Sequence, residues 1–255
     1  MESTSINSNL KVQVTNKQIL SIALPITLSI LIPQINMLTN SIFLGNLSAE
    51  ALGNAGITGV FYLIFAVDGS GLNNAMQSVF SRYAGSDDTG AFKTILSQGI
   101  RISLQLALTG ILITWFVAPF ILQQVADQKS LPQEISFLKI RIWGLPFLYL
   151  FQMGNAFFVS SLNSKYLMIG FLAESFLNIL LDYLLIYGHW GFPEMGFNGA
   201  ALASVIAEAI GFGVMFLVMV KTGLKQKYSL LESFAYNKKI NKEIVRIATP
   251  LILQF

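Results

Sequence analysis

The stretch ILSIALPITLSILIPQINMLTNSIFL, residues 19–44, decides the fold class because it contains no charged side chain. A helix needs about 20 mainly apolar residues to cross a bilayer. This stretch and five similar ones predict six spans, at Ile19–Leu44, Ala51–Phe80, Ile95–Val125, Ile135–Leu162, Tyr166–Tyr187 and Gly196–Val220. A seventh span starts near Ile244. The stretches are too long and continuous for the alternating strands of a membrane barrel. The predicted fold class is therefore all-α integral membrane, a bundle of six transmembrane helices.

The composition supports this prediction and excludes several functions. Of the 255 residues, 54% are hydrophobic and only 11% are charged, whereas a soluble domain has about 25% charged residues. The absence of Cys excludes disulfides and thiolate chemistry, and the single histidine, His189, cannot build a His-rich metal site. A net charge of +3, without basic residues gathered in a stripe, argues against nucleic-acid binding. The polar segment before residue 19 lacks the features of a signal peptide, so we expect the first span to be retained.

The distribution of basic residues predicts the orientation. With the N-terminus inside, thirteen basic residues fall on the inner side and three on the outer side. The inner residues are Lys11, Lys17, Arg82, Lys93, Arg101, Lys165, Lys221, Lys225, Lys227, Lys238, Lys239, Lys242 and Arg246, and the outer ones are Lys129, Lys139 and Arg141. Positive residues accumulate on the cytoplasmic side. We therefore expect a multi-pass protein of the cell (inner) membrane with a cytoplasmic N-terminus.

An internal similarity predicts the domain organisation. Residues 16–28, NKQILSIALPITL, match residues 241–253, NKEIVRIATPLIL, at seven of thirteen positions. Such repeats are typical of secondary transporters, whose substrate lies between two halves. We expect an N-terminal six-helix lobe at residues 1–220, a basic cytoplasmic linker at 221–242, and the truncated start of a second lobe at 243–255. The second six-helix lobe is expected to be missing from this chain, whether the chain is a truncated piece or a natural half.

Four acidic residues fall inside the predicted spans: Asp68, Glu174, Asp182 and Glu208. A carboxylate in the bilayer is costly, so each is a candidate functional residue, although each could also be merely solvated or protonated. Counting 1.5 Å per residue from the outer loops places Asn40, Asp182 and Ser204 in one layer, with Asn178 and Glu208 slightly deeper. Spacings of four residues put each of three pairs on a single helix face: Asn36 with Asn40, Asn178 with Asp182, and Ser204 with Glu208.

The other two acids are expected nearer the cytoplasm. Asp68 and Glu174 fall in a separate layer, and Glu174 lies on roughly the same helix face as Asn178 and Asp182. Such a column could pass protons inward, or Glu174 could simply be solvated at the inner interface. In the first span, Pro25 and Pro33 predict a kink, either a packing feature or a bend used in transport.

Several motifs resemble those of one transporter family. LNILLDY at residues 177–183 leads into IYG at 186–188, GFPEMG at 191–196 and GAALAS at 199–204. ALP at 23–25, NSIFLG at 40–45, EALG at 50–53 and RYAGSD at 82–87 fit the same pattern. Together they closely resemble the N-terminal lobe, with the start of the seventh helix, of the multidrug and toxic compound extrusion family. The stretch that holds Asn178 and Asp182 is the most specific.

The resemblance implies an antiporter that exports cationic or amphipathic small molecules in exchange for protons or sodium, with no other cofactor. It implies an ion-coupling site for sodium or protons at Asn40, Asn178, Asp182 and Ser204, with Asn36, Glu208, Glu174 and Asp68 as secondary candidates in a polar cavity. The family's usual Asp on the first helix is Asn40 here. An amide keeps an oxygen ligand but takes up no proton, so the choice between sodium and proton stays open.

Two other functions compete with this interpretation. A flippase of lipid-linked precursors would need several Arg or Lys in its cavity to hold phosphates, and the spans hold almost none away from their ends. An intramembrane enzyme is disfavoured because there is one His and no Gly-x-Ser-x-Gly motif. We therefore expect a transporter and not an enzyme, with the lipid bilayer and a small-molecule substrate as its partners.

Overall fold

A computed structural model describes residues 16–86, 88–232 and 234–253 of the chain. Long helices run side by side along the molecule, and no strand occurs in this described part. The main helices are α1 (Asn16–Leu47), α2 (Ala49–Gly85), α3 (Phe92–Phe116), α6 (Leu145–Ser160), α7 (Leu167–Tyr187) and α8 (Phe197–Lys221). Shorter helices are α4 (Ala118–Val125), α5 (Leu131–Arg141), α9 (Leu224–Lys227) and α10 (Lys238–Ile252), with 3-10 turns at Thr89–Ala91, Ile142–Gly144, Ser164–Tyr166 and His189–Gly191.

Five segments of the described chain are long and apolar enough to cross a membrane: Ala49–Gly85, Phe92–Phe116, Leu131–Ser160, Ser164–Tyr187 and Phe197–Lys221. The helix α1 runs beside them for 32 residues, and its residues 19–44 carry no charge. Its length of about 48 Å exceeds the hydrocarbon core of a bilayer, which is about 30 Å thick. The all-helical, multi-pass membrane fold predicted from the sequence is confirmed.

Prolines divide two of the predicted spans. Ile95–Val125 was expected to be continuous, but α3 ends at Phe116 and α4 begins at Ala118, with Pro119 in its first turn. Likewise, Ile135–Leu162 consists of α5, the turn Ile142–Gly144 and α6, which has Pro146 in its first turn. Proline is favoured in the first turn of a helix because the N–H that it lacks would have no acceptor within the helix at that position. Leu131–Ser160 still counts as one candidate membrane span, whereas the other span ends at Phe116, before the predicted end at Val125.

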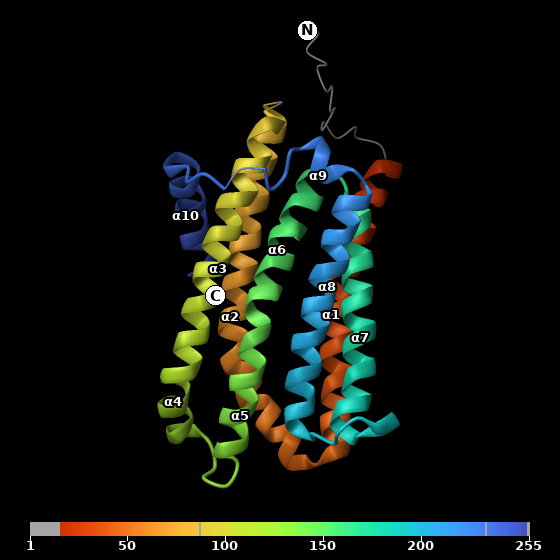
Figure 1. Cartoon of the computed structure of the whole chain (residues 1–255), viewed down its shortest axis with the longest axis vertical. Coiled ribbons are helices and arrows are strands. Elements are labelled where there is room, and N and C mark those ends of the chain that lie inside the picture. The colour runs from red at the N-terminus through yellow and green to blue at the C-terminus, as the bar shows by residue number, and fades with distance from the viewer. Residues whose placement is uncertain (1–15, 87, 233, 254–255) are drawn as a thin grey trace.

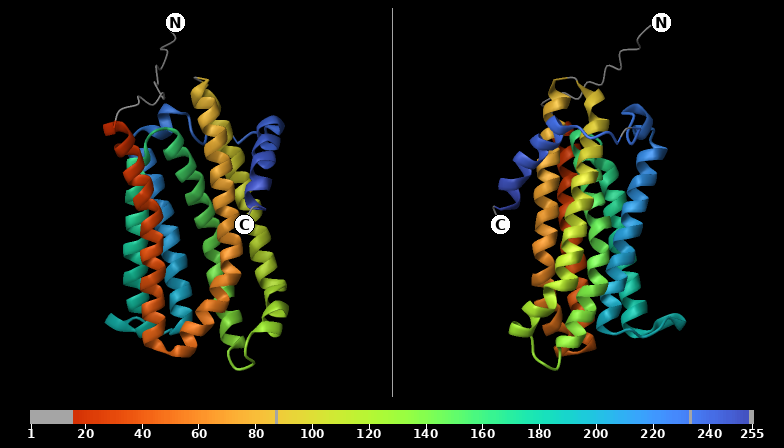
Figure 2. Two further views of the ribbon diagram at one scale, coloured as in Figure 1. Left: turned by 180° about the vertical axis from the view of Figure 1, so that it is seen from behind. Right: turned by 60° about the vertical axis from the view of Figure 1, so that its left-hand side comes forward.

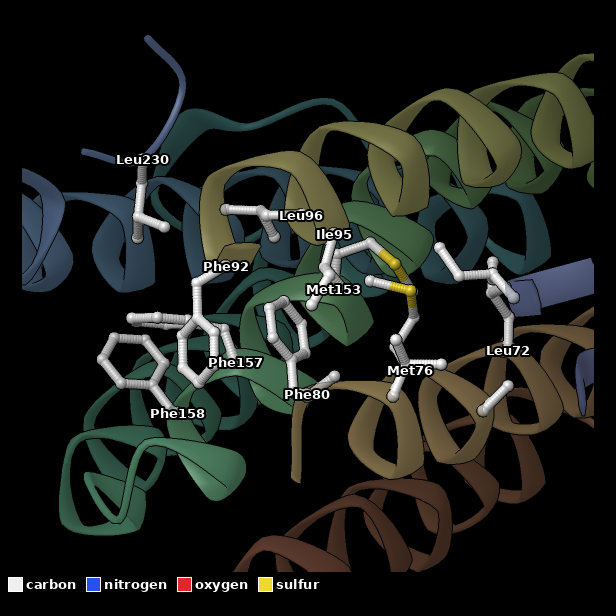
Figure 3. Packing of buried hydrophobic residues seen from close by; sticks show 14 of the residues in the cluster. Leu72, Met76, Phe80, Phe92, Ile95, Leu96, Met153, Phe157, Phe158 and Leu230 are labelled. Carbon is white, nitrogen blue, oxygen red and sulfur yellow. The ribbon is translucent and has the colours of Figure 1, made fainter. Parts of the chain in front are cut away.

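Two apolar clusters fill the two ends of the bundle. The cluster near the linker contains Phe80 of α2, Phe92 of α3 and Phe157 of α6, whose ring centroids lie 5.1 to 6.2 Å apart in edge-to-face contacts. Figure 3 shows these rings with Met76, Met153 and their neighbours. The second cluster joins the start of α2 to α4, α5 and the start of α8. Edge-to-face rings add stability beyond the area that they bury.

The segment between α8 and α10 packs onto the end of the bundle. Leu230 is fully buried in the cluster near the linker, and Tyr228 stacks on Phe92 with 5.1 Å between ring centroids. Gln98 and Arg101 of α3 donate hydrogen bonds to the carbonyl oxygens of Ala235 and Phe234, at 2.9 and 2.8 Å. Beyond this segment α10 lies against α2 and α3 (Figure 2).

Candidate ion and substrate site

A band of polar side chains lies between the two apolar clusters, on α1, α2, α5, α7 and α8. The helices α7 and α8 approach closely at one end, where a Cβ added to Gly199 would lie 2.5 Å from the carbonyl oxygen of Leu185. This contact lets the polar faces of α7 and α8 meet along the adjoining turns. Tyr187 at the end of α7 also donates a hydrogen bond of 2.7 Å to the carbonyl of Phe43, which ties α7 to α1.

Asn178 is the centre of a hydrogen-bond network across three helices. Its partners favour one amide orientation, in which the nitrogen donates to Asp182 Oδ2 at 3.3 Å and to Asn36 Oδ1 at 3.0 Å. The amide oxygen then accepts from the hydroxyl of Ser204 at 3.2 Å. In the opposite orientation only the bond between Asn178 and Ser204 would remain. The network joins α1, α7 and α8, the three helices that the sequence grouped.

Two oxygens next to this network have no hydrogen-bond partner in the described part of the chain. They are Oδ1 of Asp182, which is fully buried, and Oδ1 of Asn40. Buried polar atoms normally have a partner, and a lone one needs an explanation. A bound cation is one explanation, since carboxylate, amide and hydroxyl oxygens are its preferred ligands. The described residues include no group of three or more His, Cys, Asp or Glu side chains that could hold a metal ion.

The strongest polar interaction in the band is a buried ion pair between Arg141 at the end of α5 and Glu208 of α8. Both terminal nitrogens of the guanidinium donate to the carboxylate, Nη1 to Oε2 at 2.9 Å and Nη2 to Oε1 at 2.5 Å. Only 14% of the Arg141 side chain and 7% of the Glu208 side chain are exposed. Such fork-to-fork pairing is both strong and geometrically specific.

Two neighbours shape this ion pair. The ring of Tyr62 on α2 lies 3.9 Å from the guanidinium carbon of Arg141, a cation–π distance. Gly144, in the turn between α5 and α6, leaves space for the pair, because a Cβ there would lie 2.6 Å from Arg141 Nη1 and would overlap Glu208 Oε2. The pair therefore depends on the break between α5 and α6 and on a residue without a side chain.

Two adjoining cavities open beside these residues. One, of about 210 Å³, is lined by Asn36, Tyr62, Arg141, Glu174, Asn178, Ser204 and Glu208, among others. The other, of about 300 Å³, is lined by Asn40 and Thr58 and shares Asn36, Tyr62, Arg141, Asn178 and Ser204 with the first. Ligand pockets usually combine apolar walls with a few converging polar groups. This pair of cavities has that character.

The structure brings most of the predicted site residues together. Asn36, Asn178, Asp182 and Ser204 form one network, and Asn40 lines a cavity shared with three of them. Glu174 was expected in a separate layer with Asp68, but it lines the same cavity as Asn178 and Glu208. One face of α7 carries Glu174 and Asn178 one turn apart, as expected, so a single cavity reaches both residues.

Asp68 differs from the other candidates. It lines neither of the two cavities and has no ion-pair partner among the described residues. It lies on α2 next to Gly69, whose α-carbon faces the ring of Tyr149. The structure therefore does not place Asp68 with the other polar residues of the site.

Sequence reasoning missed two residues of this band, Arg141 and Tyr62. Arg141 was counted among the outer charges and treated as lying near the end of a span. It lies about 15 Å along the helix from Leu131 and lines both cavities. The expectation that the spans hold almost no basic residue away from their ends did not single out Arg141. Its position six residues inside the predicted span Ile135–Leu162 was the available signal.

Comparison with known proteins decides the family. Residues 25–184 match the family model described as MatE, and this range contains α1 from Pro25 and the helices α2 to α6, with most of α7. The chain belongs to the MatE family. The resemblance inferred from the motifs is thereby confirmed.

Relatives of this MatE chain include proteins described as probable multidrug resistance protein NorM. The one from Synechocystis sp. is 24% identical over 250 residues, which cover 97% of this chain and 54% of the relative. The one from Listeria monocytogenes is 28% identical over 248 residues, 92% of this chain and 52% of the relative. The chain thus spans about half the length of the curated relatives that it matches.

Solved structures of MatE proteins share the fold. A MOP superfamily transporter from Pyrococcus furiosus aligns with a TM-score of 0.82 and 21% identity, covering 99% of this chain and 55% of that one. A MATE structure described as being in the bent conformation aligns with a TM-score of 0.84 and 19% identity, covering 98% of this chain and 55% of the other. At these identities the likeness shows the fold.

Proposed function

We propose that this chain is one lobe of a secondary antiporter that exports cationic or amphipathic small molecules in exchange for sodium or protons. The observation that carries the proposal is the site itself. Inside a bundle of the MatE family, Asp182, Asn178, Ser204 and Asn36 converge beside a cavity, and the Oδ1 atoms of Asp182 and Asn40 have no hydrogen-bond partner among the described residues. The names of the NorM relatives, multidrug resistance proteins, agree with it.

In this proposal the coupling ion binds at Asp182, with Asn178, Ser204 and Asn40 as neutral oxygen ligands. Asp182 supplies the only carboxylate of that set, because an amide cannot take up a proton. If the ion is sodium, the three neutral oxygens and one charge form its shell. If it is a proton, Asp182 itself carries it. No further cofactor is required.

The proposal includes the surroundings of the lobe. The protein lies in the cell (inner) membrane with its N-terminus in the cytoplasm, which the basic residues favour. A second six-helix lobe completes the transport path, as in relatives about twice as long. A flippase of anionic lipids is disfavoured, because Arg141, the basic residue that lines both cavities, is already neutralised by Glu208.

The test is transport driven by ion gradients. Proteoliposomes that contain the two-lobe protein should move the organic cation N-methyl-4-phenylpyridinium when a sodium or proton gradient is imposed. Asp182→Asn should abolish this coupling, because the variant keeps the shape of the side chain and loses its charge. The matched control is Glu194→Gln, an exposed acid in the turn before α8, which should leave transport unchanged. Normal coupled transport by Asp182→Asn under both gradients would reject this ion site.

A further inference from the structure

The cavity contains more ionisable groups than the ion site needs. Arg141, Glu174 and Glu208 all line the cavity of about 210 Å³, whereas Asp182 lines neither that cavity nor the adjoining one. The charged groups that face this space from the surrounding helices come from α5, α7 and α8. The helices α1 and α2 contribute the neutral side chains of Asn36 and Tyr62.

The charge that a ligand meets in this cavity depends on how these three groups pair. Arg141 neutralises Glu208 through two hydrogen bonds. Glu174 has no ion-pair partner among the described residues. With Asp182 occupied by its coupling ion, and with these three groups ionised when a cation is bound, the cavity therefore offers one unbalanced negative charge to that cation. Without Arg141 it would offer two.

Two neighbouring residues fix the position of the Arg141 guanidinium. The Tyr62 ring covers the guanidinium at 3.9 Å, and Gly144 leaves the space in which the pair forms. A charged pair at this depth is not needed to hold two helices together, since buried pairs can often be replaced by apolar side chains of similar size without loss of stability. A role in setting the charge of the cavity explains why it is there.

We propose that Arg141 is a specificity-determining residue: by neutralising Glu208 it leaves Glu174 as the single unbalanced charge of the cavity, which therefore accepts organic monocations in preference to dications. The inference rests on the proposed export of cationic compounds and adds the charge number of the preferred substrate. A monocation balances Glu174, whereas a dication would bring one buried positive charge without a partner. An uncompensated buried charge is strongly unfavourable.

The experiment measures equilibrium binding of two probes to the purified 255-residue chain in detergent. N-methyl-4-phenylpyridinium carries one charge, and N,N′-dimethyl-4,4′-bipyridinium carries two on a two-ring frame of similar size. The wild-type chain should bind the monocation at least about tenfold more tightly, a difference of ~1.4 kcal/mol. Arg141→Gln should shift the ratio of the two dissociation constants at least about tenfold toward the dication. The control Arg246→Gln, an exposed arginine on α10, should not shift it.

A second pair of variants keeps the inference testable if Arg141→Gln does not fold. Glu208→Gln leaves the positive charge of Arg141 beside the cavity, so it should weaken monocation binding about tenfold or more. Adding Arg141→Gln to Glu208→Gln restores one unbalanced negative charge and should restore both the monocation affinity and the wild-type preference. Equal behaviour of the single Glu208→Gln and the double variant would overturn the role of Arg141.

The outcomes also separate this inference from the proposed function. Wild-type chain that binds both probes equally well contradicts the charge preference and leaves cation export standing. Wild-type chain that binds neither probe contradicts the charge preference of this cavity, whereas the proposed export is tested separately by transport with the two-lobe protein. The inference is supported if the preference for the monocation changes with the net charge of the cavity in each variant, and not with the number of substituted residues.

Discussion

At the scale of single residues, the site depends on which polar atoms have partners. Asn178 is saturated by Asp182, Asn36 and Ser204, and it therefore fixes the orientation of the residues around it. Oδ1 of Asp182 and Oδ1 of Asn40 find no such partner within the described residues. The bonded amide of Asn178 therefore positions the side chains of the proposed ion site, and the unbonded oxygens of Asp182 and Asn40 are the atoms with free acceptor capacity.

Gly144 gives a prediction at this scale. Gly144→Ala adds a methyl group where Arg141 Nη1 would lie 2.6 Å away. The ion pair with Glu208 must then shift, and overpacking of this kind costs about 1–3 kcal/mol. The melting temperature in detergent should fall by ~2–4 °C for each kcal/mol. Gly213→Ala is the control, because a Cβ there has nothing within 4 Å, and it should cause no loss; an equal loss in both variants would contradict the packing role of Gly144.

At the scale of elements, apolar length was enough to predict the spans but not their breaks. The ends of α7 and α8 agree with the expected ranges to within one residue. The spans that contain Pro119 and Pro146 are divided, because a proline in an apolar run can either kink a helix or start a new one. Hydropathy does not distinguish these cases. The direction in which the Arg141 side chain points depends on the break between α5 and α6, so the sequence could not place this side chain in the cavity.

The same limit applies to the polar residues. Spacings of four residues put Asn178 with Asp182 and Ser204 with Glu208 on common faces, and counting from the loops grouped residues that the structure brings together. Those rules use a single helix at a time. Which face of α5 points toward α8 depends on the packing of several helices, and that information is not local. This is why Asn36, Asn178, Asp182 and Ser204 could be grouped beforehand and the Arg141–Glu208 pair could not.

The segment after α8 gives a prediction at the scale of elements. Arg101 holds this segment to α3 through the carbonyl of Phe234, and its guanidinium lies 5.4 Å from the ring centroid of Tyr236. Arg101→Gln should loosen the segment, so trypsin should cleave at Lys225 and Lys227 faster in the folded protein. Gln105→Ala, an exposed change one turn along α3, is the control. Unchanged cleavage rates in Arg101→Gln would mean that Gln98 and the buried Leu230 hold the segment by themselves.

At the scale of the whole molecule, the basic residues and the helix order make one consistent arrangement. The start of α1, the turn between α2 and α3, and the segment that holds α9 lie at one end of the bundle, while the connection from α7 to α8 lies at the other (Figure 1). Removing Arg141 from the outer group leaves Lys129 and Lys139 there. The imbalance between the two ends is thus larger than the sequence count indicated, and it favours the first end as the cytoplasmic one.

This arrangement predicts which positions are reachable from each side. The chain has no cysteine, so a single introduced Cys reports its own location without background. Lys225→Cys, in α9, should react with a membrane-impermeant maleimide only in inside-out vesicles. Glu194→Cys, in the turn between α7 and α8, should react only when the reagent reaches the outer face of the cell membrane.

The two positions lie at opposite ends of helix α8, which crosses the bundle once, so their labelling must be opposite if α8 spans the membrane. Labelling of both from one side would contradict the span, whereas exchanged labelling would keep the span and reverse the orientation. In that reversed case, the ion site of Asp182, Asn178 and Ser204 would lie nearer the cytoplasm, and the direction in which the proposed antiporter releases its ion would have to be reversed with it.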